Sequence, residues 1–157
     1  MSTGGWVVIG AAVALVALIL ALRPLRRLGR EMIVARAREA FRLQRERLET
    51  RFLQAAAATG KPRGLRWKNC SFDDALELAR DRRTGELFAL VPVTIAFEAV
   101  EGGPMEGVEA VGNLRLATAV FTYTRGHWET VGKAVFNMDP AQTIVHFGKQ
   151  YERVAPH

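Results

Sequence analysis

Side chains that commonly carry chemistry are few in this chain of 157 residues. Its single cysteine and its three histidines are Cys70, His127, His146 and His157. Their spacing matches none of the HxxxH, CxxC or HExxH patterns of metal sites. A cysteine nucleophile needs a histidine base beside it, whereas strict alternation along 65–72 gives Cys70 the face of Phe72, opposite Trp67. We expect a buried, inert cysteine, no catalytic or metal-binding residue, and no cofactor.

Acidic residues and glycines gather around residues 101–112. The carboxylates there and at a second predicted strand end are Glu98, Glu101, Glu106, Glu109, Asp73 and Asp74. Two converging carboxylates could serve as an acid and base pair or as a cation site. The spacing is not that of a calcium loop, and the glycines lack the GK[ST] ending of a phosphate-binding loop. We interpret the segment as a solvated loop.

Four aromatic residues are the candidates for a ligand pocket: Trp67, Phe97, Tyr123 and Trp128. All four fall on predicted strands, so they could line the inside of a curved sheet. Aromatic side chains at strand spacing form a hydrophobic core more often than a ligand site. A cone-shaped domain that binds or converts a small ligand is therefore the alternative function.

The net charge of +6 is unevenly distributed along the chain. Residues 1–22 carry no charged side chain, residues 23–63 hold twelve basic and four acidic ones, and the remainder has a balance of −2. The basic character, which by itself would favour nucleic acid or an anionic surface, belongs to one segment. An apolar fraction of 49% excludes global disorder and a many-span membrane protein. One cysteine excludes an intrachain disulfide framework.

An uninterrupted apolar run covers residues 6–22. As a helix it is about 25 Å long, close to the short end of what crosses a bilayer, and Trp6 suits an interfacial membrane anchor. A cleaved signal peptide would have a basic segment before the run and a small-residue cleavage site after it, and both are missing. A buried core helix would have a polar face. We therefore predict a transmembrane helix over 6–22.

The charges that follow this helix predict its orientation. Arg23, Arg26, Arg27 and Arg30 come directly after the apolar run, whereas the tail before it has no charged side chain. The positive-inside rule places the N-terminus outside and the rest of the chain in the cytoplasm, at the inner membrane if the source is a bacterium. These arginines are expected to contact an anionic lipid surface. A lone Cys70 agrees with a reducing compartment.

A long amphipathic helix is predicted from residue 25 to about residue 58. Its apolar stripe contains Ile33, Ala37, Phe41, Leu48, Phe52 and Ala56. Gly60 and Pro62 end it. This basic stem has three possible partners: its own C-terminal domain, a second copy or partner protein in a coiled coil, or nucleic acid. We favour the first and expect no nucleic-acid binding, because glutamates interrupt the arginines and a bilayer lies adjacent.

Alternation with a period of two predicts strands after the stem, over 65–72, 75–81, 87–100, 114–124 and 127–138. The third has an apolar row from Leu87 to Ala99, and its Pro92 indicates an edge position or a bulge. Asp139 and Pro140 are the N-cap and first residue of a final helix that is expected to run to about Arg153.

The expected fold class is α+β: a transmembrane helix, then a basic helix packed on an antiparallel meander of four to five strands, then a short helix. The division is a tail over 1–5, the span over 6–22, the stem over 23–60 and the domain over 61–157. A long helix before a curved antiparallel sheet resembles the cystatin-like and nuclear-transport-factor-like folds. We expect a single-pass membrane protein whose cytoplasmic domain is a non-catalytic accessory subunit of a membrane complex, with a protein partner or a second copy bound through the stem.

Overall fold

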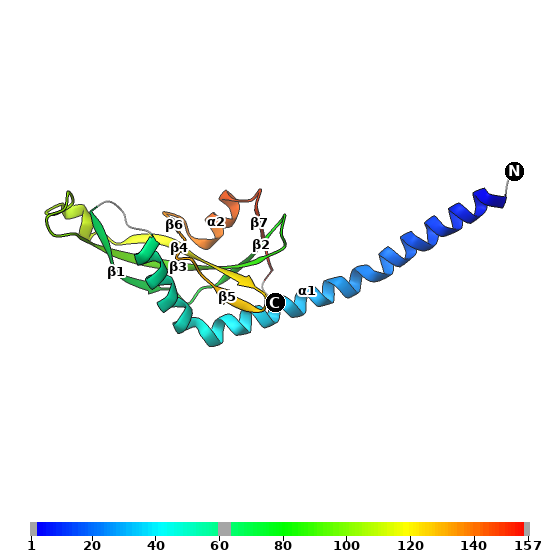
Figure 1. Cartoon of the computed structure of the whole chain (residues 1–157), viewed down its shortest axis with the longest axis horizontal. Helices are drawn as coiled ribbons and strands as arrows, with labels where there is room; N and C mark the ends of the chain where they lie inside the picture. Colours follow the sequence, from blue (N-terminus) through cyan, green and yellow to red (C-terminus); the bar gives the residue numbers. More distant parts are fainter. Residues whose placement is uncertain (1–2, 60–63, 156–157) are drawn as a thin grey trace. The chain divides into compact units, whose positions relative to one another are not determined.

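A computed structural model of the chain describes residues 3–59 and 64–155, without the side chains of 3–8 and 24–27 (Figure 1). The first element, α1, is a continuous helix over Thr3–Thr59, which ends where the sequence predicts. The chain divides into two compact units, Met1–Glu39 and Ala40–His157. The boundary of the second unit falls inside the predicted stem, so the last third of α1 belongs to the C-terminal unit.

The fold is α+β, as expected from the sequence. In the described part of the chain the strands are β1 (Leu65–Phe72), β2 (Glu77–Asp81), β3 (Leu87–Ala99), β4 (Arg115–Thr124), β5 (His127–Glu129), β6 (Ala134–Phe136) and β7 (Tyr151–Arg153). They form one antiparallel sheet in the order β5-β4-β3-β2-β7, with β1 also on β3 and β6 also on β4. A short 3-10 helix (Glu109–Gly112) lies in the loop before β4, and α2 (Pro140–His146) follows β6.

The expected four to five strands become seven for two local reasons. The segment predicted as one strand over 127–138 breaks into β5 and β6, because Gly132 takes a positive φ of 73° between them. The predicted final helix begins at Pro140 with Asp139 as its N-cap, but it ends at His146 instead of near Arg153. Residues Tyr151–Arg153 instead pair with Ala79–Asp81 as β7.

The first two strands do not form a hairpin with each other, which corrects the simple meander. β1 pairs with Val93–Ala99 and β2 with Leu87–Leu90, so both lie along the same edge of β3. Pro92 lies between these two stretches of β3. The Pro92 carbonyl accepts the N–H of Asp73. Because the N–H and C=O of a strand residue point in the same direction, the position where Pro92 lacks an N–H also faces the break between β1 and β2. A proline is tolerated in this central strand because no ladder bond is required of it there.

A bulge in β1 corrects the expected alternation of its side chains. Trp67 pairs with Phe97 and Asn69 with Ala96, which leaves Lys68 as the extra residue. The shift brings Trp67 onto the same face as Cys70, whose register partner is Ile95. The prediction that Trp67 and Cys70 lie on opposite faces was therefore wrong, because it assumed an unbroken period of two.

The sheet is covered differently on its two faces. On one, which we call the α1 face, Phe41, Leu48, Phe52 and Ala56 of α1 are buried, and the edge of the Phe41 ring contacts Phe121 of β4 at 5.2 Å. The apolar row of β3, predicted from Leu87 to Ala99, is buried on this face from Leu87 to Phe97, whereas Ala99 is half-buried. Packing of the stem helix on its own domain is thus confirmed for these residues of the second unit.

The opposite face, which we call the α2 face, carries a second and smaller core. Ile144 of α2 and Tyr151 of β7 pack with Ala79, Leu90 and Val120. Since Val120 and Phe121 are consecutive in β4, their side chains point to opposite faces. Figure 1 shows α2 and the end of α1 on opposite sides of the sheet. Helix α2 is short, so it covers only part of its face.

Candidate functional site

The four aromatic candidates form two cross-strand pairs rather than one ring of residues. Trp67 and Phe97 are register partners with ring centroids 5.1 Å apart. Tyr123 and Trp128 are register partners at 5.0 Å. Leu87 is the register partner of Tyr123 on β3, ten residues from Phe97, and ten residues of strand span about 33 Å. The two pairs therefore lie at opposite ends of the α1 face.

Rings from α1 occupy the space between these pairs. Phe41 lies 5.2 Å from Trp128, and Phe52 lies 6.4 Å from Trp67 and 5.8 Å from Phe121, measured between ring centroids. Edge-to-face contacts of this kind are typical of a packed aromatic core. Of the four candidates, Phe97 also lines a small hollow of about 50 Å³ beside Met105 and Arg115.

The membrane-contact candidates belong to α1. Arg23 and Arg30 have exposed side chains. Trp6, Arg26 and Arg27 are helical in their backbone, but their side chains lie outside the described residues. Among the described residues, α1 is the one helix that is long and apolar enough to cross a membrane, judged by length and composition. The side chains from Ile9 to Leu22 are all exposed, unlike those of a core helix.

An opening in the C-terminal unit lies on the α2 face, beside the start of α2. It has a volume of about 740 Å³ and a floor that includes Pro92, Thr94 and Leu116. Thr94 and Leu116 are register partners on β3 and β4. A second hollow of about 530 Å³ continues it past Met138 and Gln142 to Val145. We call the two together the open groove.

The floor of the open groove is apolar and poorly covered. Leu114 and Leu116 are 65% and 68% exposed, and Val145 at the far end is 78% exposed. Single exposed leucines are common, but a row of them in a concave surface marks an interaction site. The sequence predicted the strand that carries these leucines, but nothing in its alternation showed that their face lacks a cover.

Two carboxylates border the open groove, Asp73 after β1 and Asp139 at the start of α2. One oxygen of Asp73 accepts the N–H of Ala75 at 2.8 Å, and one oxygen of Asp139 accepts the N–H of Gln142 at 2.7 Å. These bonds hold one oxygen of each carboxylate in place, and both residues are exposed. Arg115 also lines the groove, and its guanidinium donates to the Ala110 carbonyl at 3.5 Å.

The connection from β1 to β2 is held by a side chain whose role the sequence did not reveal. The guanidinium of Arg45 in α1 donates to the carbonyl oxygens of Asp73 and Asp74 and, through Nε, to Glu49 at 2.7 Å. The i,i+4 spacing predicted only the pair with Glu49. Arg45 thus positions Asp73 at the edge of the open groove.

Asp81, the last residue of β2, is a second organising residue. Its carboxylate accepts the N–H groups of Thr84 and Arg83 at 2.8 Å and the side-chain amide of Gln150 at 3.1 Å. These hydrogen bonds lower the pKa of Asp81, and those from the Thr84 and Arg83 N–H groups contribute most. Burial, together with the charge of Asp81, raises the pKa of Tyr151.

Cys70 and the predicted carboxylates do not assemble into a reactive centre. Burial raises the pKa of the Cys70 thiol to about 11, which suppresses its nucleophilic thiolate near neutral pH. In the loop after β3, Glu106 accepts the N–H of Gly102 at 2.8 Å and thereby closes a turn. Among the described residues, no three His, Cys, Asp or Glu side chains are grouped so as to hold a metal ion.

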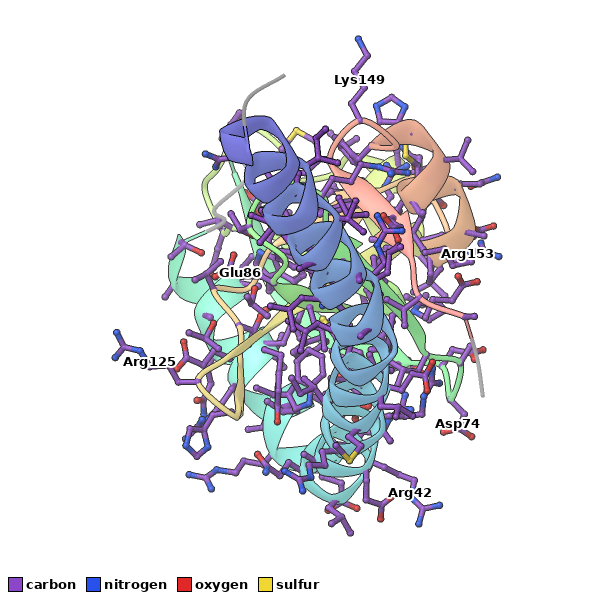
Figure 2. All side chains as sticks on the ribbon, turned by 90° about the vertical axis from the view of Figure 1, so that its right-hand side faces the viewer. Arg42, Asp74, Glu86, Arg125, Lys149 and Arg153 are labelled. Atoms are coloured by element: carbon purple, nitrogen blue, oxygen red, sulfur yellow. The ribbon has the colours of Figure 1, made fainter. Side chains whose placement is uncertain are left out.

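Charged side chains elsewhere on the C-terminal unit extend into solvent. Figure 2 shows Arg125 and Lys149 pointing away from the ribbon, in the turn between β4 and β5 and after α2 respectively. No protein-family model, curated protein or solved structure matches the chain. The function must therefore be argued from the site itself.

Proposed function

We propose that this chain is a single-pass membrane protein whose cytoplasmic α+β domain is a non-catalytic interaction subunit of a membrane complex. The observation that carries the proposal is the exposed apolar stretch of α1 from Ile9 to Leu22. Such a surface is unfavourable in water and favourable in a bilayer. Because α1 continues without interruption to Thr59, the same helix links the span to the core of the domain.

The basic segment after the span supports the orientation. Arg23, Arg26, Arg27 and Arg30 remain on the cytoplasmic side under the positive-inside rule, where each adds on the order of 1 kcal/mol of attraction to an anionic leaflet. The lipid bilayer is thus one partner, and the domain is held close to the membrane surface. We also infer a cystatin-like architecture, because a long helix precedes and covers an antiparallel sheet.

We also propose that the basic stem does not bind nucleic acid. A protein whose arginines bind phosphates of DNA loses affinity steeply with salt. Here the basic residues lie next to the proposed span, and Arg45, in the middle of the stem, is bonded to Glu49 and to two backbone carbonyls. Lipid headgroups are the closer source of negative charge.

Membrane fractionation of the full chain tests the anchor. We expect the protein to resist high-salt and alkaline washes and to need detergent for extraction, with a mass that still includes residues 1–22. Leu15→Arg combined with Leu18→Arg should release it, because each arginine near the centre of a span costs about 2.5–3.5 kcal/mol. Leu43→Arg is the control, since Leu43 is also an exposed leucine of α1 but lies beyond the span.

Recovery of the unmodified chain in the soluble fraction without detergent would contradict the anchor. A membrane fraction that lacks residues 1–22 would mean a cleaved signal sequence.

Orientation is tested by protease treatment of sealed vesicles, in which the C-terminal domain should be digested only from the cytoplasmic face. Affinity capture from detergent-solubilised membranes then tests the role as a subunit: a stoichiometric partner is expected, and capture of the chain alone argues against it.

A further inference from the structure

We propose that the open groove binds a basic segment of a partner membrane protein, with an apolar side chain on Leu114 and Leu116 and Arg or Lys side chains beside Asp73 and Asp139. The inference rests on the proposed function, because it names the kind of partner that a membrane-held domain would meet. It concerns the α2 face of the sheet, which no part of the described chain covers at this end.

The shape of the open groove favours a chain segment over a small molecule. Its two hollows, of about 740 and 530 Å³, share Asn137, Met138 and Gln142 and run on to Val145. A small-ligand pocket encloses most of its ligand's surface, whereas the leucines of this floor are two-thirds exposed. An elongated, shallow and apolar surface suits side chains projecting from an extended or helical segment.

Charge selects the chemistry of that segment. Asp73 and Asp139 stand at the border of the open groove, each exposed and with one oxygen held by a backbone N–H. The lining of the larger hollow sets these two carboxylates against one guanidinium, that of Arg115, and nearby Arg45 is paired with Glu49. The domain from Gly64 onward has a balance of −2. A cationic partner is therefore complementary, and an anionic one is repelled.

The proposed location supplies such partners. Cytoplasmic segments next to membrane spans are enriched in Lys and Arg, and they lie within reach of a domain tethered to the same surface. The lipid surface itself is a poorer occupant, because its anionic headgroups would meet Asp73 and Asp139.

Peptide titration of the full chain in nanodiscs of zwitterionic lipid tests the inference. The probe is a fluorescent peptide in which leucines alternate with arginines, and its matched control replaces every arginine with glutamate. We expect binding of the basic peptide only. The double variant Asp73→Asn, Asp139→Asn keeps both backbone hydrogen bonds and should weaken binding about three- to tenfold. Glu109→Gln with Glu129→Gln makes the same charge change away from the groove and should leave binding unchanged.

The apolar floor is tested separately. Leu116→Ser should weaken binding of the basic peptide by about tenfold, whereas Val131→Ser alters an equally exposed residue outside the groove and should have no effect. Circular dichroism of each variant establishes that its fold is intact. Equal binding of both peptides, or equal effects of the groove and control variants, would overturn the inference.

Two further outcomes identify a different occupant. Self-association of the chain that disappears in Asp73→Asn, Asp139→Asn would show that a second copy fills the groove and would overturn the assignment to another protein. If the chain needs detergent for extraction but does not bind the basic peptide, the inference about the groove is wrong and the membrane location stands. If the chain binds the peptide but fractionates as soluble, the membrane location is wrong and the inference about the groove stands.

Discussion

Gly132 determines how closely α1 approaches the sheet. It lies between β5 and β6, and a Cβ atom built on it would lie 2.2 Å from the backbone nitrogen of Ala56. Thr130 holds the turn, since its hydroxyl donates to the Val120 carbonyl and accepts the N–H of Gly132 at 3.1 Å in each case. The small residues Ala55 and Ala56 of α1 complete a contact between two backbones that no larger side chain permits.

Gly132→Ala is expected to destabilise the domain by about 3 kcal/mol or more, because the new methyl group overlaps the helix backbone and the φ is positive. Gly85→Ala is the matched control: its φ of 77° is similar but nothing lies within 4 Å, so a cost of about 1 kcal/mol is expected. Urea unfolding of the solubilised chain, followed by tryptophan fluorescence, measures both. Equal losses of unfolding free energy in the two variants would show that the close approach of Gly132 to α1 does not affect stability.

The thiol of Cys70 is expected to react slowly with iodoacetamide. With its pKa raised to about 11 by burial, the thiolate fraction at pH 8 is about a hundredfold below that of an ordinary cysteine. The rate should rise as the pH approaches 11 and should become ordinary in urea. Ser71→Cys in a Cys70→Ser background gives an exposed control thiol, expected to react at an ordinary rate. A native Cys70 that reacts as fast as this control would contradict the assignment.

At the scale of elements, polar bonds position β7 together with the buried ring of Tyr151. Asp81 closes the turn between β2 and β3 and accepts a hydrogen bond from Gln150, the residue before β7. Arg82 adds a bond to the Gly148 carbonyl at 3.0 Å. These contacts join segments about 70 residues apart.

Stability should fall in acid through Asp81. Its carboxylate has a lowered pKa in the folded chain, so its contribution is present above the unfolded-state value of about 3.9 and is lost as the pH falls through the folded-state value. Asp81→Asn keeps an acceptor for the backbone N–H groups but opposes the Gln150 amide with another donor. We expect the stability gap between the two chains to narrow below pH 4 in urea unfolding series. A gap independent of pH would contradict this role.

At the scale of the whole molecule, the C-terminal unit has its own core and the first unit consists of helix. Phe41 and Phe52 of α1, with Phe121 of β4, belong to the second unit, Ala40–His157. The smaller core on the α2 face lies within the same residues. The proposed membrane span therefore belongs to the first unit.

A fragment over Ala40–His157 is expected to stay in solution without detergent and to unfold in one cooperative transition, because all the buried core residues except Val34 and Ala37 lie inside it. Thermal denaturation by circular dichroism measures this. Phe52→Ala in the fragment should lower stability by about 3–5 kcal/mol, whereas Leu43→Ala, at an exposed leucine, should change it by less than about 0.5 kcal/mol. A fragment without a cooperative transition would show that folding needs the first unit.

Local patterns in the sequence determined much of this protein. The helical period placed Phe41, Leu48, Phe52 and Ala56 on one buried stripe, and the alternation of β3 predicted its buried row. Asp139 and Pro140 marked the start of α2. The segregation of charge separated an apolar run, a basic stem and a mildly acidic domain. Each of these depends on residues within a turn or two of one another.

Only the tertiary structure decided how these elements combine. The bulge at Lys68, the shared edge of β3 beside Pro92 and the capture of Tyr151–Arg153 by β2 all depend on partners far away in the chain. The same holds for the bonds of Arg45 to the β1–β2 connection. The open groove exists because α2, which begins beside it, leaves Leu114 and Leu116 exposed. Which distant strands pair depends on how the whole unit packs, and the hydrophobic periodicity of a single segment does not contain that information.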